Sequence, residues 1–125
     1  MKRALLLAAA AVATLAVAVS TAAGHDKQRS VRFATFNLSL NRPAHGMLRD
    51  HLSHPEVDDV FRRQARNNAE VIQRTRPDVL LINEFDYDPV AADLFRTNFL
   101  EVSQNGAAPI HYPYVFTAPS NTDIP

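Results

Sequence analysis

An apolar run that ends abruptly in polar and acidic residues sets the first limit on the fold. The segment RPDVLLINEFD, residues 76–86, contains the run Val79–Ile82 and then passes directly to Asn83 and Glu84. A short continuous apolar run is typical of a strand that is covered on both faces. A carboxylate at the end of such a strand is costly to desolvate unless a cation or hydrogen-bond donors meet it. The segment therefore predicts a buried strand over residues 78–85 that ends in a polar site.

A strand and a helix are predicted before this segment. VRFATFNLSL, from Val31, alternates side chains on two faces and predicts a strand. Residues 41–50 contain Pro43 and Gly46 and predict a loop with at most a short helical turn. The motif Ser53-His54-Pro55-Glu56 predicts a helix start, with Ser53 as the cap, and the helix should stop near Thr75. Its apolar face would contain Val57, Phe61, Ala65, Ala69 and Ile72.

A second helix and a third strand are predicted after residue 86. Asp88-Pro89 is a cap followed by a first-turn proline, and it predicts a helix through about Phe99. Asn105-Gly106 predicts a turn, and YPYVFTA, from Tyr112, predicts a strand near the edge of the sheet. Strand, helix, strand, helix, strand is the order of an α/β fold in which helices pack on a sheet.

The N-terminus has the three parts of a secretory signal. Two basic residues are followed by the charge-free apolar stretch Leu5–Val19 and by small residues that suit cleavage. We therefore expect a signal peptide at residues 1–23, a polar linker at 24–30, and a secreted, periplasmic or extracellular domain at 31–125 without a membrane span after cleavage. An uncleaved membrane anchor is the alternative. The chain has no cysteine, which excludes disulfides.

The charge of the chain limits its partners. Without residues 1–23 the chain keeps 11 of its 13 basic residues and all 13 acidic residues, which gives a formal charge of −2. A chain with this balance has no long-range attraction for nucleic acid or for an anionic membrane. We therefore expect no strong non-specific DNA binding, and a polyanion would need a local site or a metal.

The ends of the first two strands carry the residues with the clearest chemistry. Asn37 lies near the end of the first strand, and Glu84 ends the second. If these strands are parallel neighbours, an amide oxygen and a carboxylate meet at one edge of the sheet. Such hard oxygen ligands suit Mg²⁺ or Mn²⁺.

Two segments resemble the endonuclease/exonuclease/phosphatase superfamily, which has a DNase I-like fold. They are VRFATFNLSL, with Asn37 at the asparagine of the first strand, and AEVIQRTRPDVLLINEF, with Glu84 at the metal-binding glutamate. The resemblance covers residues 31–86 well and the remainder loosely. It implies a four-layer α/β sandwich and metal-assisted hydrolysis of a phosphoester, with Glu84 as the Mg²⁺ or Mn²⁺ ligand and Asn37 as its partner. The substrate would be a nucleic acid, a phospholipid or a small phosphate ester.

The chain departs from the family pattern in two respects. Asn83 stands where the family often has glutamine, which is a small change of amide length. The downstream histidine, Asp-x-Asn pair and terminal Asp-His pair of the family have no match in this chain. We therefore expect the sequence to correspond to the N-terminal portion of such a domain and to be inactive alone.

Two other functions fit the same residues. Glu84 would be the general acid of a retaining glycosidase, although this needs a second carboxylate about 5 Å away and the usual proline after the glutamate is replaced by Phe85. A secreted fragment or binding module that merely inherits the fold is the non-enzymatic alternative. Loss of Mg²⁺ binding in Glu84→Gln would distinguish the phosphoesterase from both.

The remaining charged residues have simpler explanations. Asp88 is best explained as a helix cap, while Asp86 is a less favoured additional metal ligand. His51 and His54 lie three residues apart near acidic residues, but a loop and helix-start role is favoured over zinc. The Arg-rich helix predicts a solvated surface balanced by acidic neighbours, with phosphate contact as the alternative. Its basic residues are Arg62, Arg63, Arg66, Arg74 and Arg76, and the acidic ones are Asp58, Asp59 and Glu70.

Overall fold

The computed structural model describes residues 30–119. The expected signal peptide at residues 1–23 lies outside this part of the chain, as does the expected linker at 24–30 apart from Ser30. The described elements are the strands β1 (Phe33–Leu40) and β2 (Val79–Phe85), the helices α1 (Met47–Ser53), α2 (Val60–Thr75) and α3 (Pro89–Phe95), and the π-helical turn η1 (Arg96–Leu100). None of the helices within residues 30–119 has the length and apolar character needed to cross a membrane.

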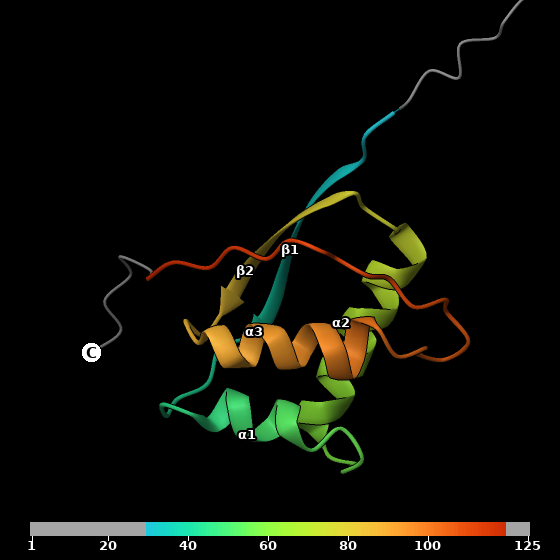
Figure 1. Cartoon of the computed structure of the whole chain (residues 1–125). Helices are drawn as coiled ribbons and strands as arrows, with labels where there is room; N and C mark the ends of the chain where they lie inside the picture. Colours follow the sequence, from blue (N-terminus) through green and yellow to red (C-terminus); the bar gives the residue numbers. More distant parts are fainter. Residues whose placement is uncertain (1–29, 120–125) are drawn as a thin grey trace, which may run out of the picture.

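The two strands form a parallel sheet, and α1 and α2 lie between them in the sequence (Figure 1). Residues pair from Phe33 opposite Val79 to Asn37 opposite Asn83. The expected α/β class is confirmed at this level. Because the strands are parallel, their carboxyl ends lie at the same edge of the sheet.

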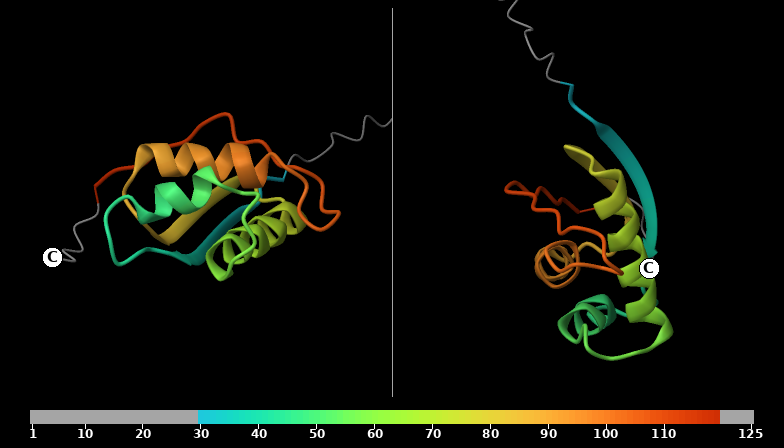
Figure 2. Two further views of the ribbon diagram at one scale, coloured as in Figure 1. Left: turned by 90° about the horizontal axis from the view of Figure 1, so that it is seen from below. Right: turned by 90° about the vertical axis from the view of Figure 1, so that its right-hand side faces the viewer.

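The hydrophobic core lies between one face of the sheet and the helices (Figure 2). Leu38 and Leu40 of β1 are buried there, whereas the alternate residues of this strand are exposed. This alternation follows the period of two that the sequence predicts. The helical part of the core consists of Leu48 and Leu52 of α1, Ala65, Ala69 and Ile72 of α2, Ala91 and Phe95 of α3, and Phe99 and Leu100 of η1.

Helix α2 ends where the sequence predicts but begins later. Ser53 is the last residue of α1 rather than the cap of α2, and its hydroxyl donates to the Arg49 carbonyl at 2.8 Å. Asp59 is the actual cap and accepts a hydrogen bond from the Arg62 N–H at 2.8 Å. The loop expected over residues 41–50, with at most a short helical turn, leads into a longer helix, because α1 begins at Met47 directly after Gly46, which has a φ of 81°.

Strand β2 is covered on one face only among the described residues, so the expectation of two covered faces is wrong. Leu80 and Ile82 pack against the core, while Val79 is 47% exposed and Leu81 is 61% exposed. The reason is that the helices α1–α3 contribute their apolar side chains to a single core on one side of the sheet.

Helix α3 follows the sequence prediction, whereas the third strand does not form. The Asp88 side chain caps α3 and Pro89 occupies the first turn, and the helical path continues to Leu100 through η1. Asn105 and Gly106 form the expected turn between Gln104 and Ala107.

Residues 112–118 run past the sheet as an irregular chain (Figure 1). Tyr114 is 91% exposed and Phe116 is 92% exposed. A strand requires a neighbouring backbone with unpaired N–H and C=O groups. Within the described residues, this segment is held instead by the Tyr112 hydroxyl, which donates to the Pro77 carbonyl at 2.8 Å.

Candidate functional site at the ends of the parallel strands

The carboxyl ends of β1 and β2 each contain a residue with a left-handed backbone. Ser39 has a φ of 49° and Glu84 has a φ of 53°. Residues other than glycine, asparagine and aspartate rarely adopt this conformation, because the side chain crowds the backbone. Each such residue costs on the order of 1–2 kcal/mol and persists only when its surroundings hold it. Two of them on paired strands mark this edge as a constrained site.

The left-handed residues lie at an irregular step in the pairing of the two strands. Asn37 lies opposite Asn83 and Leu40 lies opposite Phe85, so two residues of β1 oppose one residue of β2. This is the geometry of a β-bulge, which bends a strand and re-aims its side chains. Ile82 and Phe85 both pack against the core although they are three positions apart. The irregular step at Glu84 therefore leaves this carboxylate exposed while Phe85 turns inward.

A serine hydroxyl joins the two predicted site residues. The Ser39 Oγ lies 3.2 Å from Glu84 Oε2 and 3.3 Å from Asn37 Oδ1. The backbone N–H of Ser39 also donates to Asn37 Oδ1 at 3.0 Å. Asn37 and Glu84, which are 47 residues apart in sequence, are thus brought to one exposed cluster, which we call the strand-end cluster (Asn37, Ser39 and Glu84). All three of its side chains are exposed.

Ser39 is the member of the cluster that sequence reasoning missed. It lies two residues after Asn37, so the period of the strand places both side chains on the same face. That signal was present in the sequence. Asn83 has a different role, because its Nδ2 donates to the Thr35 Oγ1 at 2.9 Å across the strands.

Polar side chains from α2 hold the end of β1. The Gln64 Nε2 donates to the Ser39 carbonyl at 2.8 Å, and the Asn68 Nδ2 donates to the Leu38 carbonyl at 2.8 Å. These carbonyls lie at the bulge, where the regular ladder to β2 is interrupted. Side-chain amides therefore replace the backbone partners that the bulge removes.

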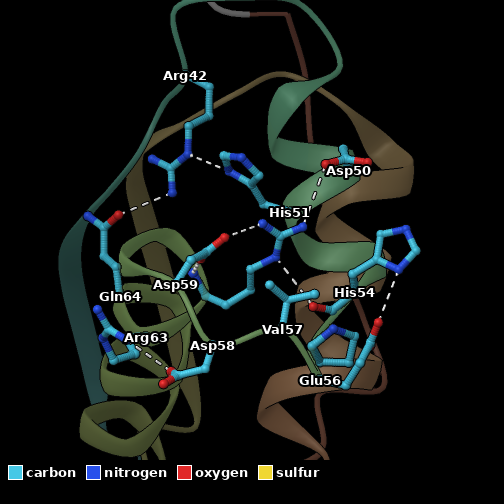
Figure 3. A network of polar contacts seen from close by, with 12 residues as sticks. Arg42, Asp50, His51, His54, Glu56, Val57, Asp58, Asp59, Arg63 and Gln64 are labelled. Atoms are coloured by element: carbon cyan, nitrogen blue, oxygen red, sulfur yellow. Dashed lines mark hydrogen bonds and ion pairs between the residues drawn. The ribbon is translucent and has the colours of Figure 1, made fainter.

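Arg42 connects the ends of both strands to the helices. Its Nη1 donates to the Ser39 carbonyl at 3.1 Å, and its backbone N–H donates to the Asp86 carboxylate at 3.1 and 3.2 Å. The Nε donates to His51 Nδ1 at 3.2 Å, and the Nη2 donates to Gln64 Oε1 at 3.1 Å (Figure 3). A single side chain thus contacts β1, α1 and α2, while its backbone N–H contacts the residue that follows β2.

His51 and Phe61 both contact the Arg42 side chain. The two rings stack with their centroids 4.4 Å apart, and the Arg42 guanidinium carbon lies 4.9 Å from the Phe61 centroid. His51 is buried, and its pKa is lowered by desolvation and by the charges of Arg62 and Arg42, which Asp59 and Asp50 oppose. Burial lowers the pKa of Arg42 as well, against the attraction of Asp86 and Asp59.

The other acidic residues near the strand ends have structural partners. Asp86, considered as an additional metal ligand, accepts the Arg42 N–H. Asp88 accepts from the Val90 and Ala91 N–H groups at 2.9 and 3.3 Å and pairs with Arg49 at 2.7 Å. The cap predicted at Asp88 is confirmed. A cleft of about 330 Å³ lies beside these residues, between Arg42, His45, Arg49, Asp86 and Asp88.

The Arg-rich helix is balanced by acidic residues, as the sequence predicts. The pairs are Arg62 with Asp59 and Asp50, Arg63 and Arg66 with Asp58, and Arg74 with Glu70. Arg62 differs from the expectation of a solvated face, because it is only 8% exposed and its Nε also donates to the His54 carbonyl. His54 contacts Glu56 at 3.2 Å.

The strand-end cluster contains hard oxygen atoms of a kind that Mg²⁺ or Mn²⁺ accepts. They belong to one carboxylate, one amide and one hydroxyl. Mg²⁺ keeps several waters and takes only one or two protein carboxylates, so this donor set fits a partial, solvent-exposed coordination shell. Across residues 30–119, no three His, Cys, Asp or Glu side chains gather as a metal-binding group.

Comparison with known proteins gives no relative for this chain. No family model, curated protein or solved structure matches it.

Proposed function

We propose that this chain is part of an exported, metal-dependent phosphoesterase similar to the endonuclease/exonuclease/phosphatase superfamily. The observation that carries the proposal is the strand-end cluster, in which Ser39 contacts both Asn37 and Glu84 at the carboxyl edge of parallel strands. Ligand sites in sheets of this kind form at that edge. The four-layer DNase I-like sandwich is the architecture that we propose for the complete domain.

Each residue of the cluster has a role in this proposal. Glu84 supplies the charged ligand for Mg²⁺ or Mn²⁺, and Asn37 supplies an amide oxygen beside it. Ser39 orients Asn37 through its backbone N–H and Glu84 through its hydroxyl. A bound ion would neutralise charge on a phosphoryl oxygen and lower the pKa of a water molecule. The left-handed conformations fix the cluster before an ion binds, which reduces the cost of ordering it.

The substrate in this proposal is a phosphoester that is held locally. The near-neutral formal charge of the chain supports a local site over a long basic surface. The paired arginines of α2 support the same view, because their charges are balanced by carboxylates of the same chain.

Paramagnetic Mn²⁺ tests the proposal without requiring activity. Amide signals of Asn37, Ser39 and Glu84 should broaden first when Mn²⁺ is added to the isotope-labelled 125-residue chain. Glu84→Gln should remove this broadening, because it preserves the shape of the side chain and removes its charge. Asp78→Asn, at the opposite end of β2, is the matched control and should leave the broadening unchanged. Broadening that persists in Glu84→Gln, or its absence from the unaltered chain, would refute the proposal.

A further inference from the structure

Arg42 is placed to control the conformation of the strand-end cluster. The left-handed Ser39 is held through its carbonyl by Arg42 Nη1 and by Gln64 Nε2. The same guanidinium donates to Gln64 Oε1, so both donors of the Ser39 carbonyl belong to one connected network. If Arg42 moves, the Ser39 carbonyl loses its hydrogen bond from Arg42. Gln64 then also loses the partner that orients its amide toward the same carbonyl.

The position of Arg42 depends on the protonation state of His51. A guanidinium only donates hydrogen bonds, so the contact between Arg42 Nε and His51 Nδ1 requires an unprotonated Nδ1. Protonation would place an N–H group against the Arg42 N–H and add a positive charge beside a buried cation. The bond would then be replaced by repulsion.

The charged groups around His51 come from α1, from α2 with its cap, and from the segment after β1. Arg42 approaches from the segment after β1, and Asp50 lies on the same helix as His51. Arg62 and its cap Asp59 approach from α2. Asp59 and Asp50 pair with Arg62, which largely compensates their negative charges. The positive charges of Arg42 and Arg62 therefore disfavour protonation of His51. Phe61 stacks on the His51 ring and helps to hold it in its buried position.

We infer that Arg42 is a positioning residue for the strand-end cluster and that it holds Ser39 against Glu84 only while His51 is neutral. The inference deepens the proposed function, and it rests on that proposal for the role of the cluster in metal binding. Acidification below neutral pH would release Arg42, relax the left-handed Ser39 and separate its hydroxyl from Glu84.

A pH titration followed by NMR tests this coupling. As the pH falls from about 7.5 to about 5, where histidine side chains titrate, the amide signals of Ser39 and Glu84 should shift with the same midpoint as the His51 ring. His51→Gln supplies an amide oxygen that accepts from Arg42 and does not titrate, so the shared transition should disappear. His54→Gln is the control and should keep the transition. A transition that survives in His51→Gln, or a His51 titration that leaves both amides unmoved, would overturn the inference.

Arg42→Lys provides a second test at a constant pH of about 7.5, in the range where histidine is mainly neutral. Lysine keeps the charge but lacks the planar fork that reaches several acceptors at once. The Ser39 and Glu84 signals should move toward their low-pH positions, and Mn²⁺ affinity should fall about tenfold, as expected for one lost charge-assisted hydrogen bond. Unchanged signals would contradict the positioning role.

The Mn²⁺ and pH measurements separate the two proposals. Coupling between His51 and Ser39 without Mn²⁺ broadening would support the positioning role of Arg42 and refute the metal-dependent function. Broadening at Glu84 without the coupling would support the function and refute the positioning role.

Discussion

Gln73 has the lowest exposure among the buried polar side chains of the described residues. It is 2% exposed, and its Nε2 donates to the carbonyls of Phe99, Leu100 and Val102 at 3.2, 2.9 and 2.7 Å. Its Oε1 accepts the N–H of Gln104 at 3.1 Å. One amide thus satisfies the backbone groups that the end of the π-helical turn leaves free. Gln73 thus links α2 to the end of η1, together with Gln104, whose Nε2 also donates to the Phe99 and Val102 carbonyls.

Replacement of Gln73 by glutamate should strongly destabilise the fold. The variant loses the donor and places a charge against three carbonyls, so the free energy of unfolding should fall by about 2–4 kcal/mol. Urea unfolding of the full chain measures the change. Asn67→Asp makes the same change of amide to acid at an exposed position of α2 and should stay within about 0.5 kcal/mol. Equal effects of the two changes would contradict the role assigned to Gln73.

Asp88 should contribute stability that depends on pH. Burial raises the pKa of this carboxyl, but hydrogen bonds from Arg49 and from the Ala91 and Val90 N–H groups outweigh burial, and the pKa lies below its ordinary value. A carboxyl with a lowered folded-state pKa stabilises the fold above its unfolded pKa and loses this contribution as the pH falls through the folded value.

Asp88→Asn should therefore flatten the acid side of the stability profile. Asparagine still caps a helix, but the bond with Arg49 loses its charge, so the cost near neutral pH should be about 1.5 kcal/mol. Between about pH 5 and pH 2 the variant should lose less stability than the unaltered chain. Thermal unfolding across this range provides the measurement. Asp93→Asn, an exposed carboxylate on the same helix, is the control, and an unchanged profile in Asp88→Asn would exclude the assignment.

At the scale of elements, the start of α2 differs from the start that the local sequence motif predicts. Ser53-His54-Pro55-Glu56 satisfies a capping motif, yet the chain uses Ser53 to end α1 and Asp59 to begin α2. Asp59 is the more stable cap because its carboxylate accepts hydrogen bonds from both the Arg62 N–H and the Arg62 guanidinium. Hydrogen bonding holds the pKa of Asp59 below its ordinary value, with the Arg62 N–H as the main cause.

Alanine replacements of Ser53 and Asp59, the predicted and the observed cap of α2, should have unequal effects on stability. Asp59→Ala removes the cap of α2 and one partner of the buried Arg62, so it should cost about 1–3 kcal/mol. Ser53→Ala removes one hydroxyl bond within α1 and should cost less than about 0.5 kcal/mol. Chemical denaturation of both variants provides the comparison. A larger cost for Ser53→Ala would restore the start that the sequence motif predicts.

The elements that the sequence predicted well are those specified by local residues. The alternation from Phe33, the end of α2 before Pro77 and the cap at Asp88 each depend on neighbours in the chain. The third strand failed because pairing requires a distant backbone, which the sequence of residues 112–118 does not reveal. The expected juxtaposition of Asn37 and Glu84 follows from parallel order alone. The left-handed Ser39 and Glu84 could not be predicted, because neither position contains glycine or another residue that signals this conformation.

At the scale of the whole molecule, the sheet separates a packed face from an exposed one. Phe33 and Leu81 are 73% and 61% exposed, whereas Leu80 on the neighbouring position packs against the core. A parallel sheet is usually covered on both faces. The described fold therefore derives its stability from one face of the sheet.

Threonine replacements on the two faces should separate stability from surface behaviour. Phe33→Thr and Leu81→Thr introduce a β-branched residue, which suits an exposed position of a strand, so the free energy of unfolding should change by less than about 1 kcal/mol. Leu80→Thr removes apolar contacts and introduces a hydroxyl, so it should cost about 2–3 kcal/mol. Equilibrium unfolding gives the stability, and binding of a hydrophobic dye should fall only in the outer-face variants. A large loss of stability in Leu81→Thr would show that the exposed face carries part of the core.

Because of the irregular step in β2, the adjacent positions 84 and 85 tolerate different substitutions. Position 84 projects away from the interior and is restricted mainly by its backbone torsion, which asparagine, aspartate and glycine also tolerate. Position 85 is restricted by volume, because its ring packs with Phe95 at a centroid distance of 6.0 Å. The side chain at position 84 can thus be exchanged in a single mutation while the interior keeps its shape.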